Sequence, residues 1–195
     1  MLRIFSAVTI CTILATQMPS KALSAGLADR LFKFFQDLKE GDVVYTTKAS
    51  YPQRQSRVDC VMRTKTVSDN TVARLCMQTN INSRRLPPFP MKLSYRRTSN
   101  GDVVTEGLSS GPRNTLTIHY VGDTCVVYSV KGLKALAPKG RACGIWRKGF
   151  GYHVPNDNEC QGKATEACGS VWRTISTYEK CIRVPIPQCK YYQDT

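Results

Sequence analysis

The sequence predicts an all-β domain: an eight-stranded antiparallel barrel with an N-terminal helix and a C-terminal helix packed on it. Short runs rich in β-branched and aromatic residues alternate with turn residues at fairly regular spacing, as in an antiparallel barrel or sandwich. Helical patterns occur only before and after these runs. A barrel of eight strands leaves no free sheet edge and encloses room for one small ligand.

The first 25 residues have the layout of a secretory signal peptide. Arg3 gives a positive start, Ile4 to Ala15 is largely apolar, and small residues follow. Cleavage is expected after Ala22 or Ala25, which leaves residues 26–195 as a single domain. The apolar run is shorter than the about 20 residues that a membrane-spanning helix needs. We therefore expect a secreted, extracellular protein with no membrane span.

The order of elements follows from local patterns. Leu27 to Glu40 places apolar residues three and four apart, as in a helix, and Gly41 is a typical helix stop. Asn and Gly residues then separate several strand-like runs. These runs cover residues 43–47, 58–67, 71–79, 91–96, 103–106, 116–121 and 125–130. Arg84 to Pro90 carries three prolines and is expected to be a stiff loop.

The last third of the chain completes the predicted barrel. Cys143 to Arg147 provides the eighth strand. A helix is expected through Glu159 to Ala167, with an N-cap at one of residues 156–158 and a stop at Gly169. Val171 to Tyr178 is expected to be a final extended segment.

The cysteine content indicates an oxidising compartment. Of nine cysteines, Cys11 lies in the expected leader, and the remaining eight allow up to four disulfides. The absence of a C-x-x-C pair gives no support for a zinc ribbon or a thioredoxin-like site. Spacing alone does not choose among the possible pairings.

The chain is strongly basic. Without Arg3 and Lys21 of the leader, 26 basic residues face 14 acidic ones. Such a surface attracts anions, acidic partners or polyanionic glycans, although it can also serve only to keep a secreted protein soluble. The basic residues form short clusters and no nucleic-acid motif, so a nucleic-acid partner is not expected.

The cysteines of the second half stand in an ordered pattern, and shorter motifs precede it. The pattern comprises Cys125-Val126-Val127, Cys143-Gly144-Ile145-Trp146, Pro155 then Cys160, Cys168-Gly169, and Thr177 to Cys181; the earlier motifs are Asp29 to Phe32, Val43 to Tyr45 leading to Tyr51, and Asp59 to Val61. Across essentially the whole mature chain, this set resembles the tick salivary lipocalins, close to their histamine-binding and tissue-targeting members. The general lipocalin signature, glycine-x-tryptophan on the first strand, is absent.

The resemblance implies two disulfides. Cys60 would pair with Cys181, and Cys125 would pair with Cys160. Cys76, Cys143, Cys168 and Cys189 would supply further pairs that the resemblance does not assign.

The resemblance also bears on the ligand. Amine-binding members carry an aspartate directly after the cysteine that Cys125 matches and a glutamate shortly before the aromatic residue that Trp146 matches. Here these positions are Val126 and Gly144. A buried protonated amine needs a carboxylate partner, so tight histamine or serotonin binding is not expected. Other members carry leukotrienes, fatty acids or sterols.

Six residues of the predicted strands are candidates for the barrel interior: Tyr45, Arg63, Tyr95, His119, Tyr128 and Trp146. An apolar tube with a few polar side chains would suit an amphipathic or anionic lipid. Each candidate also has an ordinary structural interpretation, since barrel aromatics usually belong to the core and Arg63 or His119 could face solvent.

The favoured function is sequestration of a small hydrophobic or anionic host mediator, of the leukotriene, fatty acid or sterol class. The resemblance implies that this would modulate host inflammation or haemostasis. The alternatives are biogenic amine binding and a basic scaffold that binds a host protein or glycosaminoglycan. An enzyme is not expected, because the two histidines are far apart, the cysteines should be oxidised, and no catalytic motif is present. No cofactor or metal site is expected.

Overall fold

The computed structural model describes residues 20–51, 58–81, 84–99, 101–108, 111, 113–136, 140–149 and 158–189. It contains three helices and ten strands within these ranges. The helices are α1 (Ser20–Gln36), α2 (Asn158–Cys168) and α3 (Tyr178–Cys181). The strands are β1 (Val43–Ala49), β2 (Val58–Ser68), β3 (Val72–Ile81), β4 (Arg84–Arg85), β5 (Phe89–Thr98), β6 (Gly101–Gly107), β7 (Arg113–Val121), β8 (Cys125–Val130), β9 (Cys143–Lys148) and β10 (Arg173–Thr174).

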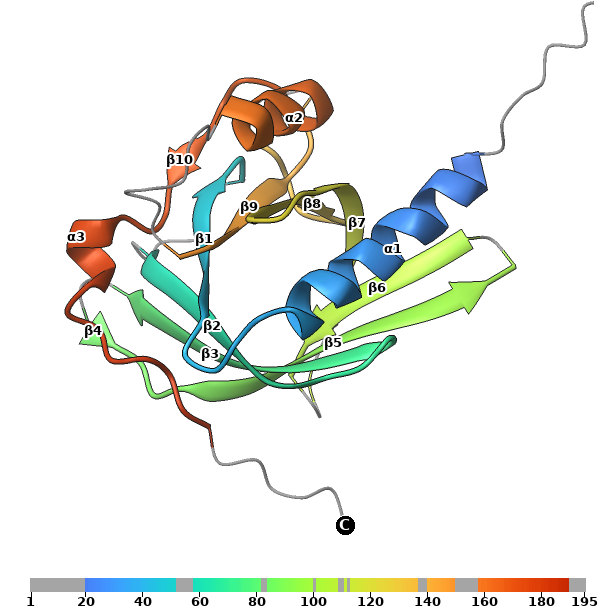
Figure 1. Cartoon of the computed structure of the whole chain (residues 1–195). Coiled ribbons are helices and arrows are strands. Elements are labelled where there is room, and N and C mark those ends of the chain that lie inside the picture. The colour runs from blue at the N-terminus through green and yellow to red at the C-terminus, as the bar shows by residue number, and fades with distance from the viewer. Residues whose placement is uncertain are drawn as a thin grey trace, which may run out of the picture.

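Eight of the strands close into an antiparallel barrel. The sheet runs β1-β2-β3-β5-β6-β7-β8-β9, and β9 pairs again with β1 (Figure 1). The short strands β4 and β10 are additions to β3 and β1. The predicted eight-stranded antiparallel barrel is therefore confirmed. Because the first and last strands are hydrogen-bonded, neither leaves an unpaired edge along its paired length.

Helix α1 covers one end of the barrel (Figure 1). Its buried residues Leu31, Phe32 and Phe35 join the main hydrophobic core inside the barrel. The helix meets the three hairpins at this end: Gln36 Nε2 donates to Asn70 Oδ1 at 2.9 Å, the Phe32 ring lies 6.1 Å from the Tyr95 ring, and Arg30 donates to the carbonyl of Val121. The connection from α1 to β1 passes through Gly41, whose φ of +84° suits a residue without a Cβ.

Helix α2 lies on the barrel wall. Ala164 and Cys168 of α2 pack against Val127 of β8 and against Cys143 and Ile145 of β9. A helix near the closed end and a helix on the wall are the arrangement that the sequence predicted. No helix among the described residues is long and apolar enough to cross a membrane.

Four disulfides fasten the segments that follow the barrel. Cys125–Cys160 and Cys143–Cys168 join α2 to β8 and β9. Cys60–Cys181 and Cys76–Cys189 join residues 181–189, here called the C-terminal strap, to β2 and β3. The structure thus contains both bridges that the resemblance implied, and it pairs the four cysteines that were left unassigned.

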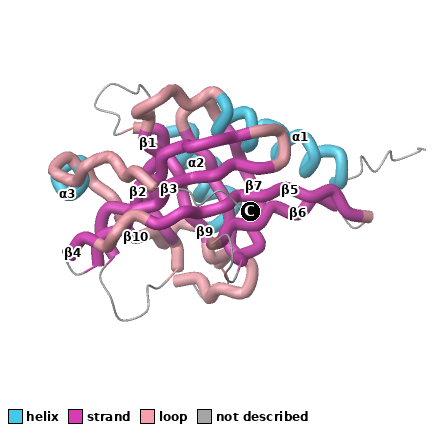
Figure 2. The backbone as a smooth tube through the Cα atoms, turned by 90° about the horizontal axis from the view of Figure 1, so that it is seen from below, coloured by secondary structure: helices cyan, strands magenta, loops and turns pink. Residues whose placement is uncertain are grey.

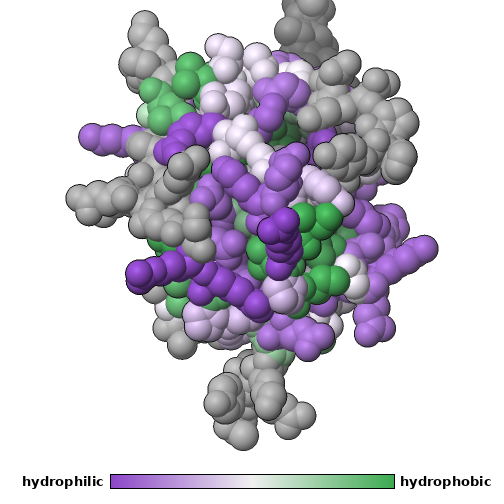
Figure 3. All heavy atoms as spheres, turned by 90° about the vertical axis from the view of Figure 1, so that its left-hand side faces the viewer, coloured by the Kyte–Doolittle hydropathy of each residue, from purple (hydrophilic) through white to green (hydrophobic). Residues whose placement is uncertain are grey.

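The C-terminal strap covers part of the outer face of the barrel. The hydroxyl of Thr64 donates to the carbonyl of Pro187 at 2.9 Å, and Val184 packs beside Cys60 and Cys181. Ile182 and Ile186 of the strap remain about half exposed. Figure 3, which faces the side that carries α3, shows hydrophobic residues in small patches among hydrophilic ones.

Apart from shifts of a few residues at strand ends, three segments differ from the sequence prediction. Helix α1 runs from Ser20 to Gln36 rather than from Leu27 to Glu40. Part of the predicted stiff loop at 84–90 is in strands, because β4 and the start of β5 both pair with β3. The predicted extended segment at 171–178 contains the two-residue β10 and then turns into α3. The predicted leader falls mostly on residues 1–19, which lie outside the described residues, and its cleavage stays a prediction.

The disulfides Cys76–Cys189 and Cys143–Cys168 should contribute about equally to stability. With Cys60–Cys181 intact, replacing Cys76 and Cys189 with alanine opens a loop of about 24 residues, made of residues 60–76 and 181–189, although the two cysteines are 113 positions apart. Replacing Cys143 and Cys168 opens a loop of 25 residues. In the chain-entropy description each change costs about 3.5 kcal/mol of unfolding free energy. Urea unfolding of both double variants measures the two losses, and a difference of more than about 1.5 kcal/mol would contradict this expectation.

Candidate ligand-binding site

Three of the six predicted interior residues meet inside the barrel: Arg63 of β2, Tyr128 of β8 and Trp146 of β9. Tyr128 and Trp146 are almost fully buried and belong to the same core as α1. Their rings lie 4.3 Å apart, and Phe35 of α1 contacts the Trp146 ring edge-on at 5.8 Å. The Arg63 guanidinium carbon lies 5.0 Å from the centre of the Trp146 ring, which is within cation–π range.

Arg63 is paired with a carboxylate inside the barrel. Its Nε and one terminal nitrogen donate to Oε1 of Glu106, on β6, at 3.1 and 3.0 Å. Its other terminal nitrogen donates to Oγ1 of Thr46, on β1, at 2.7 Å. Both charged side chains are less than a tenth exposed. The pair therefore joins three strands across the interior, and its net charge is zero.

The pKa of Arg63 reflects this pairing. Burial acts to lower the pKa, but attraction to the Glu106 carboxylate and the hydrogen bonds to it outweigh burial and leave the pKa raised. The guanidinium is consequently charged at all accessible pH values. An isolated cation at this depth would be very costly, so the carboxylate is a structural requirement for Arg63.

Two phenols complete the polar cluster. The hydroxyls of Tyr51 and Tyr128 are hydrogen-bonded to each other. Burial raises the pKa of both groups, that of Tyr128 well above its usual value. Both therefore stay neutral and can donate and accept hydrogen bonds. We use the name interior cluster for Thr46, Tyr51, Arg63, Glu106, Tyr128 and Trp146.

The cluster contains a buried donor without a partner. Trp146 is fully buried, and its indole Nε1 has no hydrogen-bond partner among the described residues. Buried N–H groups are nearly always paired with protein, water or ligand. The indole N–H is thus the donor of this cluster that lacks a partner within the described residues.

The two positions of the amine-binding pattern also face the interior. Val126 is fully buried in the core and lies opposite Trp146 in the strand register. Gly144 lies two residues before Trp146 on β9, hence on the same face. A Cβ at Gly144 would clash with the Tyr128 hydroxyl and would lie 2.8 Å from its Cε1. The Tyr128 phenol therefore occupies the space that an acidic side chain at position 144 would need.

The other three predicted residues lie elsewhere. Tyr45 is on the outer face, where it packs with Val43 and Met62 and lines a surface depression of about 590 Å³. Tyr95 is on the inner face, two residues after the buried Leu93, but it lies near the α1 end, where it is partly buried against Phe32 and does not join the interior cluster. His119 also faces outwards. Strand alternation explains why Tyr45 faces outwards, because its neighbours Val44 and Thr46 point inwards.

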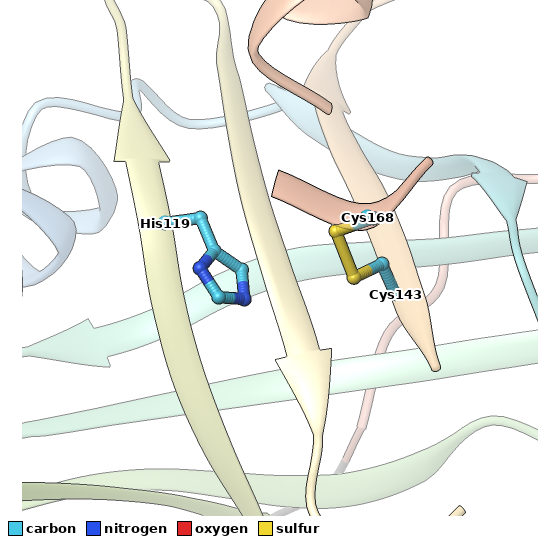
Figure 4. A group of neighbouring side chains, drawn as sticks. All are labelled: His119, Cys143 and Cys168. Atoms are coloured by element: carbon cyan, nitrogen blue, oxygen red, sulfur yellow. A yellow bond between two sulfur atoms is a disulfide. The ribbon is translucent and has the colours of Figure 1, made fainter. Parts of the chain in front are cut away.

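The surroundings of His119 are shown in Figure 4. Its Nε2 lies 2.8 Å from the Ser129 hydroxyl, and its ring is close to the Cys143 and Cys168 sulfurs. These two sulfurs are bonded to each other, so they are not thiolate ligands for a metal. Burial, and next Arg141, lower the pKa of His119 below 6.5.

Three members of the interior cluster were not among the predicted residues: Thr46, Tyr51 and Glu106. The sequence predicted no acidic side chain inside the barrel, and the buried Glu106 shows that this prediction was wrong. Its pairing with Arg63 joins residues 43 positions apart, and no local pattern signals such a contact. Thr46 lies two residues after the inward-facing Val44. Strand alternation would have predicted that Thr46 also points inwards if the inner face of β1 had been known from the sequence.

Comparisons with known proteins identify the architecture. No protein-family model matches the chain, and no curated protein matches it. Among solved structures, lobster apocrustacyanin A1 matches with a TM-score of 0.50 at 11% identity, over 76% of this chain and 86% of that chain. Apocrustacyanin C2 gives the same values. Together with the closed eight-stranded barrel, this decides the fold class. The fold is that of a lipocalin.

A third structure, Japanin from Rhipicephalus appendiculatus bound to cholesterol, matches with a TM-score of 0.47 at 12% identity, over 72% of this chain and 95% of that chain. At identities this low, the two crustacyanin matches support the lipocalin fold and say nothing about the ligand of this chain.

The buried ion pair should show strong coupling. Glu106→Gln leaves the Arg63 charge without its carboxylate, and we expect a loss of about 3–5 kcal/mol of unfolding free energy. Replacing both residues, as Arg63→Met with Glu106→Leu, removes the unpaired charge and should recover most of that loss. A double-mutant cycle by urea unfolding measures the coupling. Additive losses in the two single variants would show that the pair does not interact as described.

The lowered pKa of His119 predicts a pH effect on stability. Because its pKa is lower in the folded than in the unfolded protein, the unfolded state binds the proton more readily. The free energy of unfolding should thus decrease as pH falls through 6.5, and His119→Gln should reduce this decrease. Proton NMR of the ring, assigned by comparison with the variant, measures the pKa. A value at or above 6.5 would be inconsistent with the buried setting.

Proposed function

We propose that the barrel binds a small, mostly apolar molecule that carries one neutral polar group, such as the hydroxyl of a sterol, and that it withholds this molecule from solution. The observation that carries the proposal is the unpartnered Nε1–H of the buried Trp146, set beside a neutral tyrosine hydroxyl and an internally compensated Arg63–Glu106 pair. Binding sites for small molecules commonly combine apolar walls with a few polar groups that orient the ligand.

The charge of the interior cluster favours a neutral head group over an anionic one. Arg63 already has Glu106 as its counterion, at 3.0 Å. A second carboxylate in the same place would put two anions against one cation in a medium of low polarity. Among the leukotriene, fatty acid and sterol classes, the electrostatic repulsion between two interior carboxylates favours a neutral sterol-like ligand over a fatty acid.

A biogenic amine is also disfavoured. The interior acid, Glu106, is held by two hydrogen bonds from Arg63, so an incoming ammonium would have to compete with a resident guanidinium. Val126 and Gly144 supply no carboxylate at the two positions that the amine-binding members use. Amine binding is therefore the weaker alternative.

The proposed route of entry is the end of the barrel opposite α1. The α1 end is closed by Leu31, Phe32 and Phe35. At the opposite end lie the chain connections after β1, β3, β6 and β8. Tyr51, which follows β1 there, carries a neutral hydroxyl that is hydrogen-bonded to Tyr128.

We infer the wider role from the disulfides and from the resemblance of the cysteine pattern. Four disulfides suit a protein of an oxidising, extracellular compartment, and a binding barrel needs no catalytic groups. Together with the likeness of the cysteine pattern to tick salivary lipocalins, this supports a secreted protein that removes a host mediator of inflammation or haemostasis and is not an enzyme.

Fluorescence can test the ligand class. Trp172 is the second of the two tryptophans, and its Nε1 donates to the carbonyl of Gly169 near the surface. Trp172→Phe therefore leaves Trp146 as the single reporter. We expect cholesterol to change Trp146 emission with a submicromolar Kd, arachidonate to bind at least tenfold more weakly, and histamine to give no signal. Tighter binding of arachidonate or histamine than of cholesterol would reject the proposed head group.

The role of the indole N–H can be isolated by substitution. Trp146→Phe keeps an aromatic ring but removes the donor, and we expect about a five- to tenfold loss of affinity, the usual contribution of one hydrogen bond. Calorimetric titration measures it, with Trp172→Phe as the matched control that should leave affinity unchanged. Equal affinity in both variants would remove Trp146 Nε1 from the proposed site.

A further inference from the structure

Charge is unevenly distributed over the outer face of the barrel, away from the proposed interior site. Between Asn70 and Gly122 the chain has seven arginine or lysine residues and two acidic residues, Asp102 and Glu106. Glu106 is buried inside the barrel with Arg63. The outward-facing part of β3, β5, β6 and β7 is consequently dominated by cations.

Strand register brings these cations together. Arg74 of β3 lies opposite Lys92 of β5, Lys92 lies opposite Gly107 of β6, and Gly107 lies opposite Arg113 of β7. This row points outwards, because the adjacent row contains Leu93 and Glu106, which are buried inside. Neighbouring strands are about 4.8 Å apart, so the row from Arg74 to Arg113 spans about 14 Å.

Two further cations extend the row. Arg96 lies on the same face as Lys92, four residues further along β5. Lys131 follows β8 and donates its backbone N–H to the carbonyl of Thr115, which places it beside β7. We call Arg74, Lys92, Arg96, Arg113 and Lys131 the basic face. Arg96, Arg113 and Lys131 are exposed, and Arg74 and Lys92 are partly so.

The residues between these cations are uncharged, and three of them carry hydroxyl groups. The next outward row contains Val72, Ser94, Thr105 and Thr115 in register, and Val103 lies opposite Arg96. No carboxylate occurs in these rows. Asp69 lies in the β2–β3 turn, where the N–H groups of Thr71 and Val72, at 2.7 Å, and to a smaller extent the charge of Lys92 hold its pKa below the usual value. The hydroxyls can donate to an anion that the cations attract.

Four lysines elsewhere on the described surface are in direct ion pairs with carboxylates. Lys33 pairs with Asp37, Lys148 with Asp42, Lys163 with Glu166, and Lys180 with Asp59. In those places positive charge is locally neutralised. On the basic face it accumulates over several strands and creates a positive potential over an extended surface.

The shape and chemistry of this surface indicate the partner. Figure 2 looks onto β2, β3, β5 and β6 from below, and α1 and α2 lie behind them. The outward rows contain no aromatic side chain, which a single-stranded nucleic acid would need for base stacking. The four disulfides also indicate an extracellular compartment. We propose that the basic face binds a sulfated polysaccharide, which would hold the protein at cell surfaces and matrix while the barrel interior remains accessible.

Matched charge variants test this proposal with heparin as the probe. The test variant combines Lys92→Gln, Arg96→Gln and Arg113→Gln. The control variant combines Lys33→Gln, Lys39→Gln and Lys163→Gln, exposed lysines of α1, its following turn and α2 that remove the same charge. We expect the test variant to bind heparin roughly tenfold more weakly than wild type, and the control within about twofold. The dependence of log affinity on log salt should be shallower in the test variant alone.

Each remaining outcome decides against the proposal. Equal losses in the two variants would mean that heparin senses only net charge. Wild-type binding to vesicles with about 30% phosphatidylserine as tight as binding to heparin would identify a generally anion-binding surface. Cholesterol titration of the test variant keeps the two proposals apart, since the basic face lies outside the barrel and its loss should leave interior binding unchanged.

Discussion

The hydrogen bonding of β1 to β9 is the constraint on which the rest of the structure depends. It turns one sheet into a closed wall and thereby separates two environments. Inside, Arg63 and Glu106 are shielded from water, which strengthens their attraction and makes either one costly without the other. Outside, alternate residues of the same strands form the basic face. The two proposed binding sites therefore lie on opposite faces of the same barrel wall.

Most of the fold could be predicted from the sequence. Cys125 to Val130 forms a strand with the predicted bounds, and the other barrel strands differ by a few residues at their ends. These segments are defined by β-branched residues and turn residues, which act locally. The elements missed, β4, β10 and α3, are two to four residues long. They depend on pairing with β3 and β1 and on the disulfide at Cys181, which are tertiary constraints without a local pattern.

The inner and outer faces of the strands were harder to predict. Alternation of apolar and polar residues reveals a face only where the other face meets water. In β8 all six residues are buried, because α2 covers the outside while the core fills the inside. The outer face of β1 is likewise packed near the C-terminal strap. Tyr128 and Tyr45 thus looked equivalent in sequence, yet only Tyr128 points inwards. Glu106 was missed because its partner Arg63 is distant in sequence.

The two bridges of the C-terminal strap also affect how the protein would respond to proteases. Cys181 and Cys189 are bonded to β2 and β3, so the residues between them form a covalently closed ring with the barrel. Cleavage after Arg183, which is exposed, would leave both new ends attached. The nicked molecule would gain only the mass of one water and would separate into fragments only after reduction. Trypsin-like enzymes could therefore cut this loop without detaching the strap from the barrel.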